Sequence, residues 1–464
     1  MFKTQKRTPS EIAEIVKSHD HIHFIGIGGI SMSALASIAH KMGFEVSGSD
    51  WTKTHITEKL KSEGIEIFIG QDAKNIHENE TIVYTAAVSE TNPEVQRAKE
   101  LELPFIYRAD FLNYIMCFSE SRIGVCGMHG KSTTSAMISH ILYRGKYDPT
   151  IIVGAELDEI GGTHHIGKGR ECVFEADEYS DSFLSFSPTI ALVLNIDIDH
   201  VDYFHSLDQI KNSFTEFIKK TENGGYTVYN ADNENVLDVM SRYTGKKVSY
   251  AIDSPADFTA ENIVFSNGNS SFDVIHNGKN IASVSLPIAG KHIVSDSLGA
   301  FALLYTYGVD SETIKDGLAS YSSVKRRMEY KCKINGADVY EDYAHHPTEI
   351  SATLLGIKPG VRGRLICAFQ PHTYTRTKGL WNEFVSSLSI ADTVLLCDIY
   401  AAREDDIYGV NSKMLADDIK NGIYLGSFEK TYEYICKNAK EDDVVIIMGA
   451  GDIYKVSDML CERK

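Results

Sequence analysis

The sequence predicts an α/β protein made of three successive segments in which short strands alternate with helices. Two glycine-rich turns support this, each lying between an apolar strand and a helical pattern: "HFIGIGGISMS" (residues 23–33) and "CGMHGKSTTSAM" (126–137). A third group of short apolar strands, again separated by helical stretches, follows residue 325. Since strand–helix–strand order produces parallel pairing, each segment is expected to hold a parallel sheet. A chain of 464 residues has room for roughly two to four domains.

The first segment begins with a strand at residues 21–26, followed by a helix at 31–43 that ends in glycine. The next strand, 44–50, ends at Asp50. Further strands are expected at 81–87 and 104–108.

The second segment begins with a strand at 122–126 and a helix at 131–144. Buried strands are expected at 171–176 and 189–196. Residues 262–286 then alternate apolar and polar side chains, interrupted by Asn267-Gly268 and Asn277-Gly278. These pairs are typical of type I′ turns, so the segment is predicted to end in an antiparallel meander.

The third segment repeats the α/β pattern, and its boundary with the second is not marked by a Pro- or Ser-rich linker. Its strands are expected at 337–343, 364–369, 393–399 and 443–449. The glycines that follow the last strand, in "MGAGDI", are interpreted as a turn at the strand end rather than an anion site.

Composition argues against nucleic-acid and membrane partners. The net charge is −18, and no block of five basic residues occurs, so nucleic acid would be repelled. No apolar run reaches the roughly 18 residues of a membrane span, and the first residues lack an apolar leader. None of the eight cysteines forms a C-x-x-C pair, and several lie in apolar runs. We therefore expect a cytoplasmic protein with reduced, buried thiols.

The second glycine-rich turn resembles a phosphate-binding loop that is shorter than the standard pattern, which needs glycine where Val125 stands. Backbone N–H groups and a helix N-terminus can hold the phosphates of ATP here. Lys131 would reach the terminal phosphates, and the Ser132 hydroxyl would ligate Mg²⁺. The alternative is a tight strand–helix turn with an exposed lysine. The predicted loop residues are Gly127, Met128, His129, Gly130, Lys131, Ser132 and Thr133.

Acidic residues at the ends of two predicted strands are candidates to complete a metal site. Glu175, Asp177 and Glu178 follow one strand, and His200 follows the next. Hard cations such as Mg²⁺ prefer oxygen ligands, which favours the acids and makes a histidine ligand unusual. The alternatives are solvated loop acids and a structural histidine.

The first glycine-rich turn resembles a dinucleotide fingerprint, Gly26-x-Gly28-x-x-Ser31, with serine in place of the third glycine. Asp50 lies where a ribose-binding acid is expected. Alone, these residues would indicate an NAD-dependent dehydrogenase or a turn without a ligand. The additional Gly29 and the ATP loop downstream instead favour a substrate that carries a nucleotide.

Taken together, these motifs resemble the Mur ligases of peptidoglycan synthesis over nearly the whole chain. The stretches that carry the resemblance are "HFIGIGGISMS", "VSGSD", "GMHGKSTT", "EADEYSDSF", "NIDIDHVDYF", "VKRRMEY", "EDYAHHPTEI", "FQPHTYTRT", "DIYAAREDDI" and "MGAGDI". The resemblance implies a Rossmann-like N-terminal domain (1–118) that binds a UDP-sugar. It also implies a P-loop ATPase-like central domain (119–325) and a Rossmann-like C-terminal domain (326–464) that closes on ATP and holds the amino acid.

"AHHPTE" and "FQPHTYTRT" point to the alanine-adding branch, whose substrates are UDP-N-acetylmuramate and L-alanine. The implied reaction is ATP-dependent amide formation through an acyl phosphate, with Mg²⁺ or Mn²⁺, by a monomer or homodimer. Lys131, Glu175 and His200 would be catalytic, with Ser132, Glu175 and His200 on the metal. The nucleotide would contact His292, Arg327 and Asp342; the amino acid would contact Tyr343, His345 and Arg376; the UDP-sugar would contact Gly28, Gly29, Ser31 and Asp50.

Three departures from the family pattern stand out. Ile293 and Asp296 occupy positions where asparagines are expected near the adenine, and Thr373 stands where some relatives carry arginine. Arg376 would then hold the alanine carboxylate alone. The alternative functions are another ligase of the superfamily, such as murein peptide ligase or folylpolyglutamate synthetase, and an inactive nucleotide-binding regulatory protein. The folate enzymes lack the first glycine-rich domain.

Overall fold

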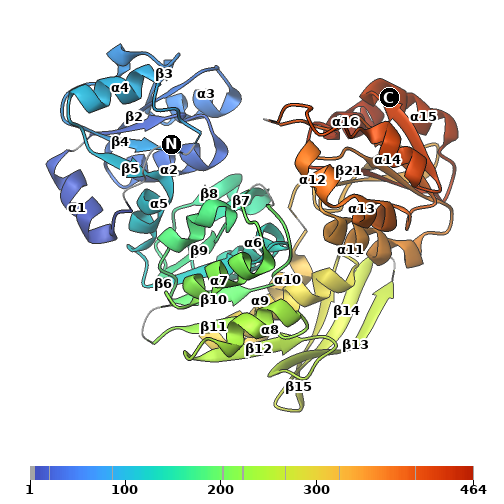
Figure 1. Cartoon of the computed structure of the whole chain (residues 1–464). Helices are drawn as coiled ribbons and strands as arrows, with labels where there is room; N and C mark the ends of the chain where they lie inside the picture. The colour runs from blue at the N-terminus through green and yellow to red at the C-terminus, as the bar shows by residue number, and fades with distance from the viewer. Residues whose placement is uncertain are drawn as a thin grey trace.

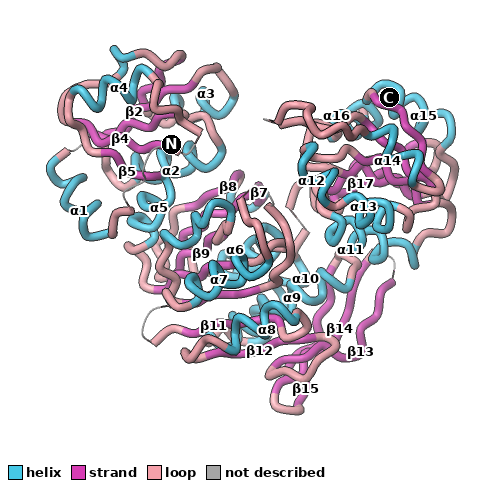
Figure 2. The backbone as a smooth tube through the Cα atoms, in the orientation of Figure 1, coloured by secondary structure: helices cyan, strands magenta, loops and turns pink. Residues whose placement is uncertain are grey.

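The computed structural model describes residues 6–19, 21–85, 87–200, 203–221, 224–266, 268–322, 324–402 and 404–462. Figure 1 shows three α/β domains in chain order, with the central domain below and between the other two. Each domain is built on its own sheet, and helices cover the sheets (Figure 2). The predicted three-domain α/β class is confirmed.

The N-terminal sheet has five parallel strands in the order β3-β2-β1-β4-β5. The strands are β1 His21–Ile25, β2 Glu45–Asp50, β3 Glu66–Ile69, β4 Glu80–Tyr84 and β5 Phe105–Tyr107. The helices are α1 Pro9–Ser18, α2 Ile30–Lys41, α3 His55–Ser62, α4 Pro93–Glu100 and α5 Arg108–Met116, with a short 3-10 turn at Ala73–Asn75. The first glycine-rich turn joins β1 to α2, so it lies at the carboxyl edge of a parallel sheet, where such folds bind ligands.

The central sheet has ten strands in the order β15-β14-β13-β12-β11-β10-β6-β9-β7-β8. They are β6 Ser121–Cys126, β7 Thr150–Leu157, β8 Gly162–His165, β9 Glu171–Glu175, β10 Ile190–Val193, β11 Tyr226–Asn230, β12 Lys247–Ala251, β13 Phe258–Ser266, β14 Asn269–His276 and β15 Lys279–Leu286. The helices are α6 Lys131–Arg144, α7 Leu207–Ile218, α8 Glu234–Ser241, α9 Lys291–Tyr307 and α10 Ser311–Ser320, with 3-10 turns at Asp158–Ile160 and Tyr179–Ser185.

The predicted meander is confirmed, because β13, β14 and β15 pair antiparallel. Asn277 and Gly278 have φ values of 52° and 70°, as a type I′ turn requires at both central residues. The other predicted turn contains Asn267, which lies outside the described residues.

The C-terminal sheet has the order β16-β17-β21-β18-β19-β20, and only its edge strand β16 is antiparallel. The strands are β16 Glu329–Ile334, β17 Ala337–Asp342, β18 Leu365–Phe369, β19 Thr393–Cys397, β20 Gly422–Gly426 and β21 Val444–Met448. The helices are α11 Pro347–Ile357, α12 Tyr374–Gly379, α13 Trp381–Leu388, α14 Ser412–Asp418, α15 Phe428–Asn438 and α16 Tyr454–Cys461, with a 3-10 turn at Lys358–Gly360.

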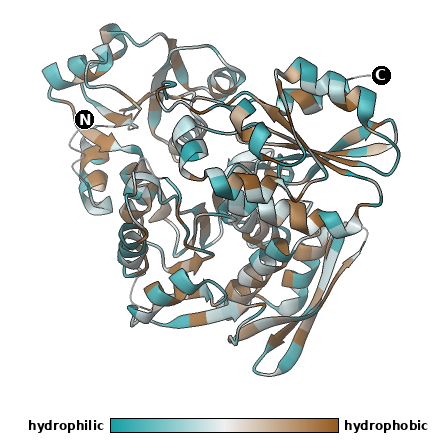
Figure 3. Ribbon diagram, turned by 45° about the vertical axis from the view of Figure 1, so that its right-hand side comes forward, coloured by the Kyte–Doolittle hydropathy of each residue, from teal (hydrophilic) through white to brown (hydrophobic). Residues whose placement is uncertain are grey.

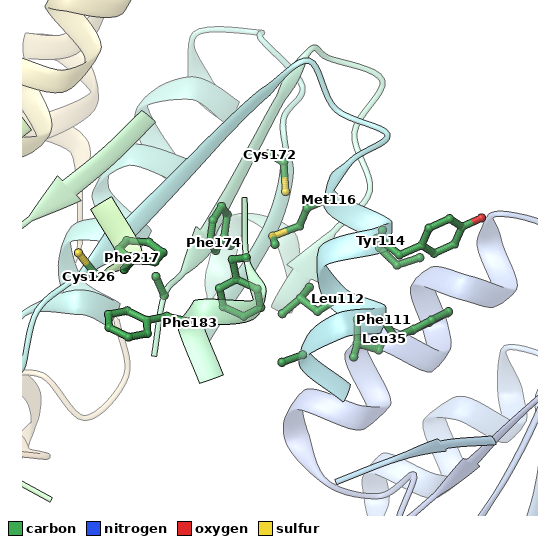
Figure 4. Close-up of a cluster of buried hydrophobic side chains, with 14 of the residues drawn as sticks. Leu35, Phe111, Leu112, Tyr114, Met116, Cys126, Cys172, Phe174, Phe183 and Phe217 are labelled. Carbon is green, nitrogen blue, oxygen red and sulfur yellow. The ribbon is translucent and has the colours of Figure 1, made fainter. Parts of the chain in front are cut away.

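Figure 3 colours the ribbon by hydropathy and shows hydrophobic residues along the helices and strands of all three domains. The buried apolar residues form clusters between the sheets and their helices. One cluster continues from the N-terminal domain into the central domain. Figure 4 shows Leu35 and Phe111 on one side of it and Phe174, Phe183 and Phe217 on the other. Fully burying an aromatic side chain contributes roughly 1.5–3 kcal/mol, so this shared core fixes the two domains together.

The expectation that every cysteine is a reduced thiol is wrong for one pair. Cys332 in β16 and Cys461 at the end of α16 form a disulfide, with Cα atoms 5.6 Å apart. The two residues are 129 positions apart, so only the packing of the final helix on the edge strand brings them together. Four others, Cys126, Cys172, Cys367 and Cys397, are buried free thiols as expected. Within the described residues, no helix is both long and apolar enough to cross a bilayer.

Candidate active site

A cleft of about 830 Å³ lies between the central and C-terminal domains. Its central-domain wall includes Lys131, Glu175 and His200, and its C-terminal wall includes Tyr343 and His345. A smaller pocket of about 190 Å³ adjoins it on the other side of His129 and Gly130. The cleft therefore brings together candidate site residues from four separate stretches of the sequence.

The second glycine-rich turn joins β6 to α6 and has the backbone that a phosphate loop needs. Gly127 and Gly130 have φ values of 148° and 81°, which side-chain-bearing residues rarely adopt. Asn195, which follows the neighbouring strand β10, holds the loop in place. Its side chain accepts a hydrogen bond from the His129 N–H (2.8 Å) and donates to the His129 carbonyl (2.9 Å). The sequence analysis did not identify this role of Asn195.

Lys131 is held by a buried carboxylate rather than exposed. Its Nζ donates to Glu178 Oε2 at 2.7 Å and to the Gly127 carbonyl at 2.7 Å. Glu178 is fully buried, so it is not the solvated loop acid of the alternative interpretation. Burial alone would lower the pKa of Lys131, but Glu178 and neighbouring acids outweigh it and raise that pKa. The lysine therefore stays charged.

His200 contacts the same carboxylate. Its Nε2 lies 3.0 Å from Glu178 Oε1. Burial opposes protonation, yet the hydrogen bond to Glu178 and the charge of Asp199 raise the pKa of His200 above its ordinary value. The backbone of His200 is left-handed, with φ 52°. In this structure the imidazole therefore pairs with Glu178, while the predicted partner Glu175 has other contacts.

Glu175 ends β9 beside the start of α6. Its carboxylate accepts hydrogen bonds from the Gly154 N–H (2.7 Å), the Ser132 hydroxyl (3.3 Å) and the Ser135 hydroxyl (3.3 Å). Burial raises the pKa of Glu175. A divalent cation would offset the cost of a charged carboxylate here, and the hydroxyl and carboxylate oxygens are ligands that Mg²⁺ prefers. Ser132 and Glu175 thus fit a metal site.

A second group of possible metal ligands, His129, Asp197 and His346, places ligand atoms within 4.8 Å of one another. Both ring nitrogens of His346 already have partners, however. Nε2 lies 3.2 Å from the Ile198 carbonyl, and Nδ1 accepts the Thr348 N–H that begins α11. Asp197 also accepts the Thr348 hydroxyl at 2.9 Å. We interpret this group as a hydrogen-bonded contact between the two domains.

The smaller pocket contains the predicted nucleotide contacts His292, Arg327 and Asp342, together with Thr133. Burial lowers the pKa of His292 to about 4 and raises that of Asp342 to about 6. Asp296 also lines this pocket, and burial raises its pKa well above the ordinary value. A Cβ on Gly130 would lie 2.9 Å from Asp296 Oδ1, so the carboxyl group packs directly against the phosphate loop.

Glu349, which sequence reasoning missed, connects several predicted residues. Its carboxylate lies 3.3 Å from His129 Nδ1 and 3.8 Å from an Arg327 nitrogen, and it accepts the His345 N–H at 3.1 Å. It is also the N3 residue of the capping box that begins α11. That capping pattern is readable in "HPTE", but its contact with the other domain is not.

Arg376, which was predicted to bind the alanine carboxylate, contacts Asp199 in the wall of the cleft. Its Nη2 donates to Asp199 Oδ1 at 2.9 Å, and both side chains are largely buried. Burial opposes ionisation of Asp199, but Arg376 and His200 hold its pKa well below the usual range. His372 connects His345 to this pair, since the ring centres of His345 and His372 lie 5.8 Å apart.

The first glycine-rich turn lies in the N-terminal domain, and its residues are not among those that line the cleft. The Gly28 N–H donates to Asp50 Oδ2 at 2.9 Å, and a Cβ on Gly28 would lie 2.7 Å from the same oxygen. Gly29 begins α2 as its N-cap residue. Arg108, which the sequence analysis did not single out, donates to the Ser31 hydroxyl at 2.7 Å. The turn thus carries an arginine suited to a phosphate.

The carbonyl groups of the "MGAGDI" turn accept hydrogen bonds from a side chain of the protein itself. Those of Gly449 and Gly451 accept hydrogen bonds from Arg326 Nη2 at 2.9 and 3.1 Å. This agrees with its interpretation as a strand-end turn.

Comparisons with known proteins divide the chain in the same order. Residues 21–119 match the Mur ligase family catalytic domain, 125–304 the Mur ligase middle domain, and 326–451 the Mur ligase glutamate ligase domain. A UDP-N-acetylmuramate–L-alanine ligase of Acetivibrio thermocellus is 45% identical over 450 residues, which is 96% of each chain. The enzyme of that name from Clostridium tetani is 45% identical over 451 residues, covering 96% of this chain and 99% of the relative.

Two crystal structures extend the comparison to the fold. A UDP-N-acetylmuramate–alanine ligase from Thermotoga maritima superposes with a TM-score of 0.80 at 28% identity, over 96% of this chain and 98% of the other. A murein peptide ligase from Psychrobacter arcticus superposes with a TM-score of 0.68 at 24% identity, over 95% and 98%. The second similarity concerns the fold alone.

Proposed function

The chain belongs to the Mur ligase family, and on that premise we propose how its residues join L-alanine to UDP-N-acetylmuramate at the expense of ATP. It is a ligase of peptidoglycan synthesis, as its full-length relatives are. The observation that carries the site assignment is the buried Lys131–Glu178 pair beneath a glycine-rich loop, in a cleft shared by two domains. We place UDP-sugar binding in residues 1–118, ATP binding in 119–325 and the amino-acid site in 326–464.

ATP would lie with its phosphates over Gly127–Thr133 and its base in the smaller pocket near His292, Arg327 and Asp342. Lys131 is suited to the terminal phosphates because it remains charged and is already aimed by Glu178. The UDP diphosphate would lie over Gly28 and Gly29, near Ser31 and Arg108, while Asp50 secures the Gly28 backbone.

Ser132 and Glu175 would hold Mg²⁺, with Mn²⁺ as the alternative ion, and His200 would join them after leaving Glu178. The ion would neutralise charge between the triphosphate and the substrate carboxylate. Lys131 adds a fixed positive charge in the same place, which favours the approach of two anions. The carboxylate of the UDP-sugar would attack the γ-phosphate of ATP, which forms an acyl phosphate and releases ADP. The alanine amine would then attack the acyl carbon, which forms the amide bond and releases phosphate and a proton.

The amino acid would be held on the C-terminal wall. Arg376 offers a fork of N–H groups for the alanine carboxylate. Burial lowers the pKa of His345 to about 4, so its imidazole is neutral near pH 7 and available to the incoming amine. Closure of the C-terminal domain would exclude water from the intermediate. We further propose that the enzyme works in the cytoplasm, where its ATP is supplied, as a monomer or homodimer.

The test is phosphate release from ATP and Mg²⁺, with UDP-N-acetylmuramate and each amino acid supplied or omitted, and with the product weighed. Release that requires both partners, and a product heavier by one alanine residue, would support the proposal. Release with a tripeptide acceptor but not with alanine would instead identify a murein peptide ligase. Absence of turnover in a folded protein that still binds the UDP-sugar would support an inactive homologue.

A further inference from the structure

The contact between Asp199 and Arg376 joins the two domains at the reaction cleft. One oxygen of Asp199, Oδ1, accepts three hydrogen bonds: from the His200 N–H at 2.7 Å and from Arg376 Nε and Nη2 at 3.2 and 2.9 Å. The first donor belongs to the central domain and the other two to the C-terminal domain. A single buried carboxylate therefore links the backbone of His200 to the side chain of Arg376.

Arg376 is not itself one of the residues that line the cleft, but the other edge of its guanidinium makes little contact with the described residues. Asp199 takes the edge formed by Nε and Nη2, whereas the edge formed by Nη1 and Nη2 is the one that binds a carboxylate end-on. Within the part of the chain that the structure describes, Nη1 has one long contact, at 3.4 Å to His372 Nδ1. An arginine has five N–H donors, so Arg376 can keep Asp199 and still offer one N–H on each Nη nitrogen to a ligand. Asp199 therefore does not need to be displaced when a carboxylate binds.

The same oxygen also supports a strained backbone. His200 has φ 52°, a conformation that costs a residue with a side chain roughly 1 kcal/mol. Its N–H is satisfied by the preceding carboxylate, and its carbonyl accepts the N–H groups of Tyr203 and Phe204, each at 2.8 Å. Asp199 thus contributes to the position of the imidazole as well as that of the guanidinium.

We propose that Asp199 is a positioning residue that presents Arg376 to the carboxylate of the incoming amino acid. Arginine loses considerable rotamer freedom when it binds a ligand, and a partner that fixes it beforehand removes much of that cost. The inference rests on the proposed role of Arg376.

The experiment measures KM for L-alanine, ATP and UDP-N-acetylmuramate in Asp199→Asn, Asp199→Glu, Arg376→Gln and the Asp199→Asn/Arg376→Gln double variant. Asp199→Asn should raise KM for alanine about tenfold and leave the other two KM values within about twofold. The double variant should be no worse than Arg376→Gln alone, because the asparagine oxygen can still accept the His200 N–H and the contact that changes is the one with Arg376. Asp199→Glu should recover part of the loss.

A matched control is Asp443→Asn. Asp443 also binds an arginine, Arg364, at 2.6 Å in the C-terminal domain, but it lies outside the residues that line the cleft. Its loss should leave KM for alanine unchanged. If Asp199→Asn does not unfold cooperatively, Asp199→Glu carries the test, since glutamate keeps the charge but displaces the carboxylate from Arg376 by one methylene; an unchanged KM for alanine in that variant would then overturn the inference.

An unchanged or lowered KM for alanine in Asp199→Asn would overturn the inference; a lowered value would mean that the carboxylate competes with the substrate. If Arg376→Gln also leaves that KM unchanged, the proposed role of Arg376 fails with it. If Arg376→Gln raises KM while Asp199→Asn does not, only the inference fails.

Discussion

Lys131 Nζ and Glu178 Oε2 lie 2.7 Å apart, with the Glu178 side chain completely buried and the Lys131 side chain 15% exposed. Burying either charge without the other would be costly in free energy, so each side chain is stable in this position only while its partner is present. The arrangement keeps the lysine charged and aimed along the phosphate loop. It also makes the folded state dependent on a residue that we place in catalysis.

Replacing Lys131 by methionine should therefore reduce both stability and activity. Glu178 would keep the His200 imidazole but lose the lysine, which should cost up to about 3–5 kcal/mol of unfolding free energy, and turnover should fall by about 10²–10³. The double variant Lys131→Met/Glu178→Gln should recover most of the stability but none of the activity. Urea unfolding and phosphate release measure the two effects separately. Lys291→Met is the control because Lys291 and its partner Asp253 are mostly exposed. A double variant as unstable as the single one would contradict this account.

Replacing Glu175 by glutamine should weaken metal binding while preserving the local fold. The glutamine oxygen can still accept the Gly154 N–H, but the negative charge beside Ser132 is lost. The concentration of Mg²⁺ that gives half-maximal turnover should rise by about tenfold or more. Mn²⁺ titration followed by electron paramagnetic resonance gives a second measurement that does not depend on turnover. Unchanged metal affinity would place the ion elsewhere.

The His200–Glu178 contact predicts a pH dependence of stability. The folded-state pKa of His200 is raised above 6.5. Its contribution to stability is therefore fully present below about pH 6.5 and is lost as the pH rises through the raised value. The unfolding free energy of the metal-free protein, compared with that of His200→Gln between pH 5.5 and 8.5, should show a difference that shrinks as the pH rises. Metal affinity should move in the opposite direction, because a metal ligand must be the neutral imidazole. A difference that grows with pH would contradict the assignment.

Replacing Gly28 by alanine should weaken UDP-sugar binding and lower stability. The new Cβ would lie 2.7 Å from Asp50 Oδ2, so the loop or the aspartate must move, at about 1–3 kcal/mol. Gly29→Ala is the matched control for stability, since its Cβ would meet only the Gly26 carbonyl at an ordinary 3.5 Å. Calorimetric titration with UDP-N-acetylmuramate and thermal unfolding test both statements. Equal stability losses in the two variants would show that the Asp50 contact is not responsible.

Strands with continuous apolar runs were predicted well, and weaker strands were not. The central strands β1, β6, β10, β18 and β21 all lie where the sequence places them, because buried parallel strands must be apolar on both faces. The strands β7, β8, β11 and β12 of the central sheet were missed, and so were β3, β16 and β20 at the edges of their sheets. Their partly exposed residues, as in "EIFI" and "GIYLG", do not produce a distinctive period.

The sequence by itself determined the phosphate loop, the start of α6 and the three-domain order. These features depend on neighbouring residues: a glycine backbone, a helix N-terminus and a lysine one turn away act together because they are consecutive. Tertiary structure alone decided which partner each charged side chain has. Glu178 rather than Glu175 holds Lys131 and His200, and Asp199 meets Arg376 across 177 positions of sequence. Such contacts form only when folding brings distant segments together, and burial then makes any charge that lacks a partner costly.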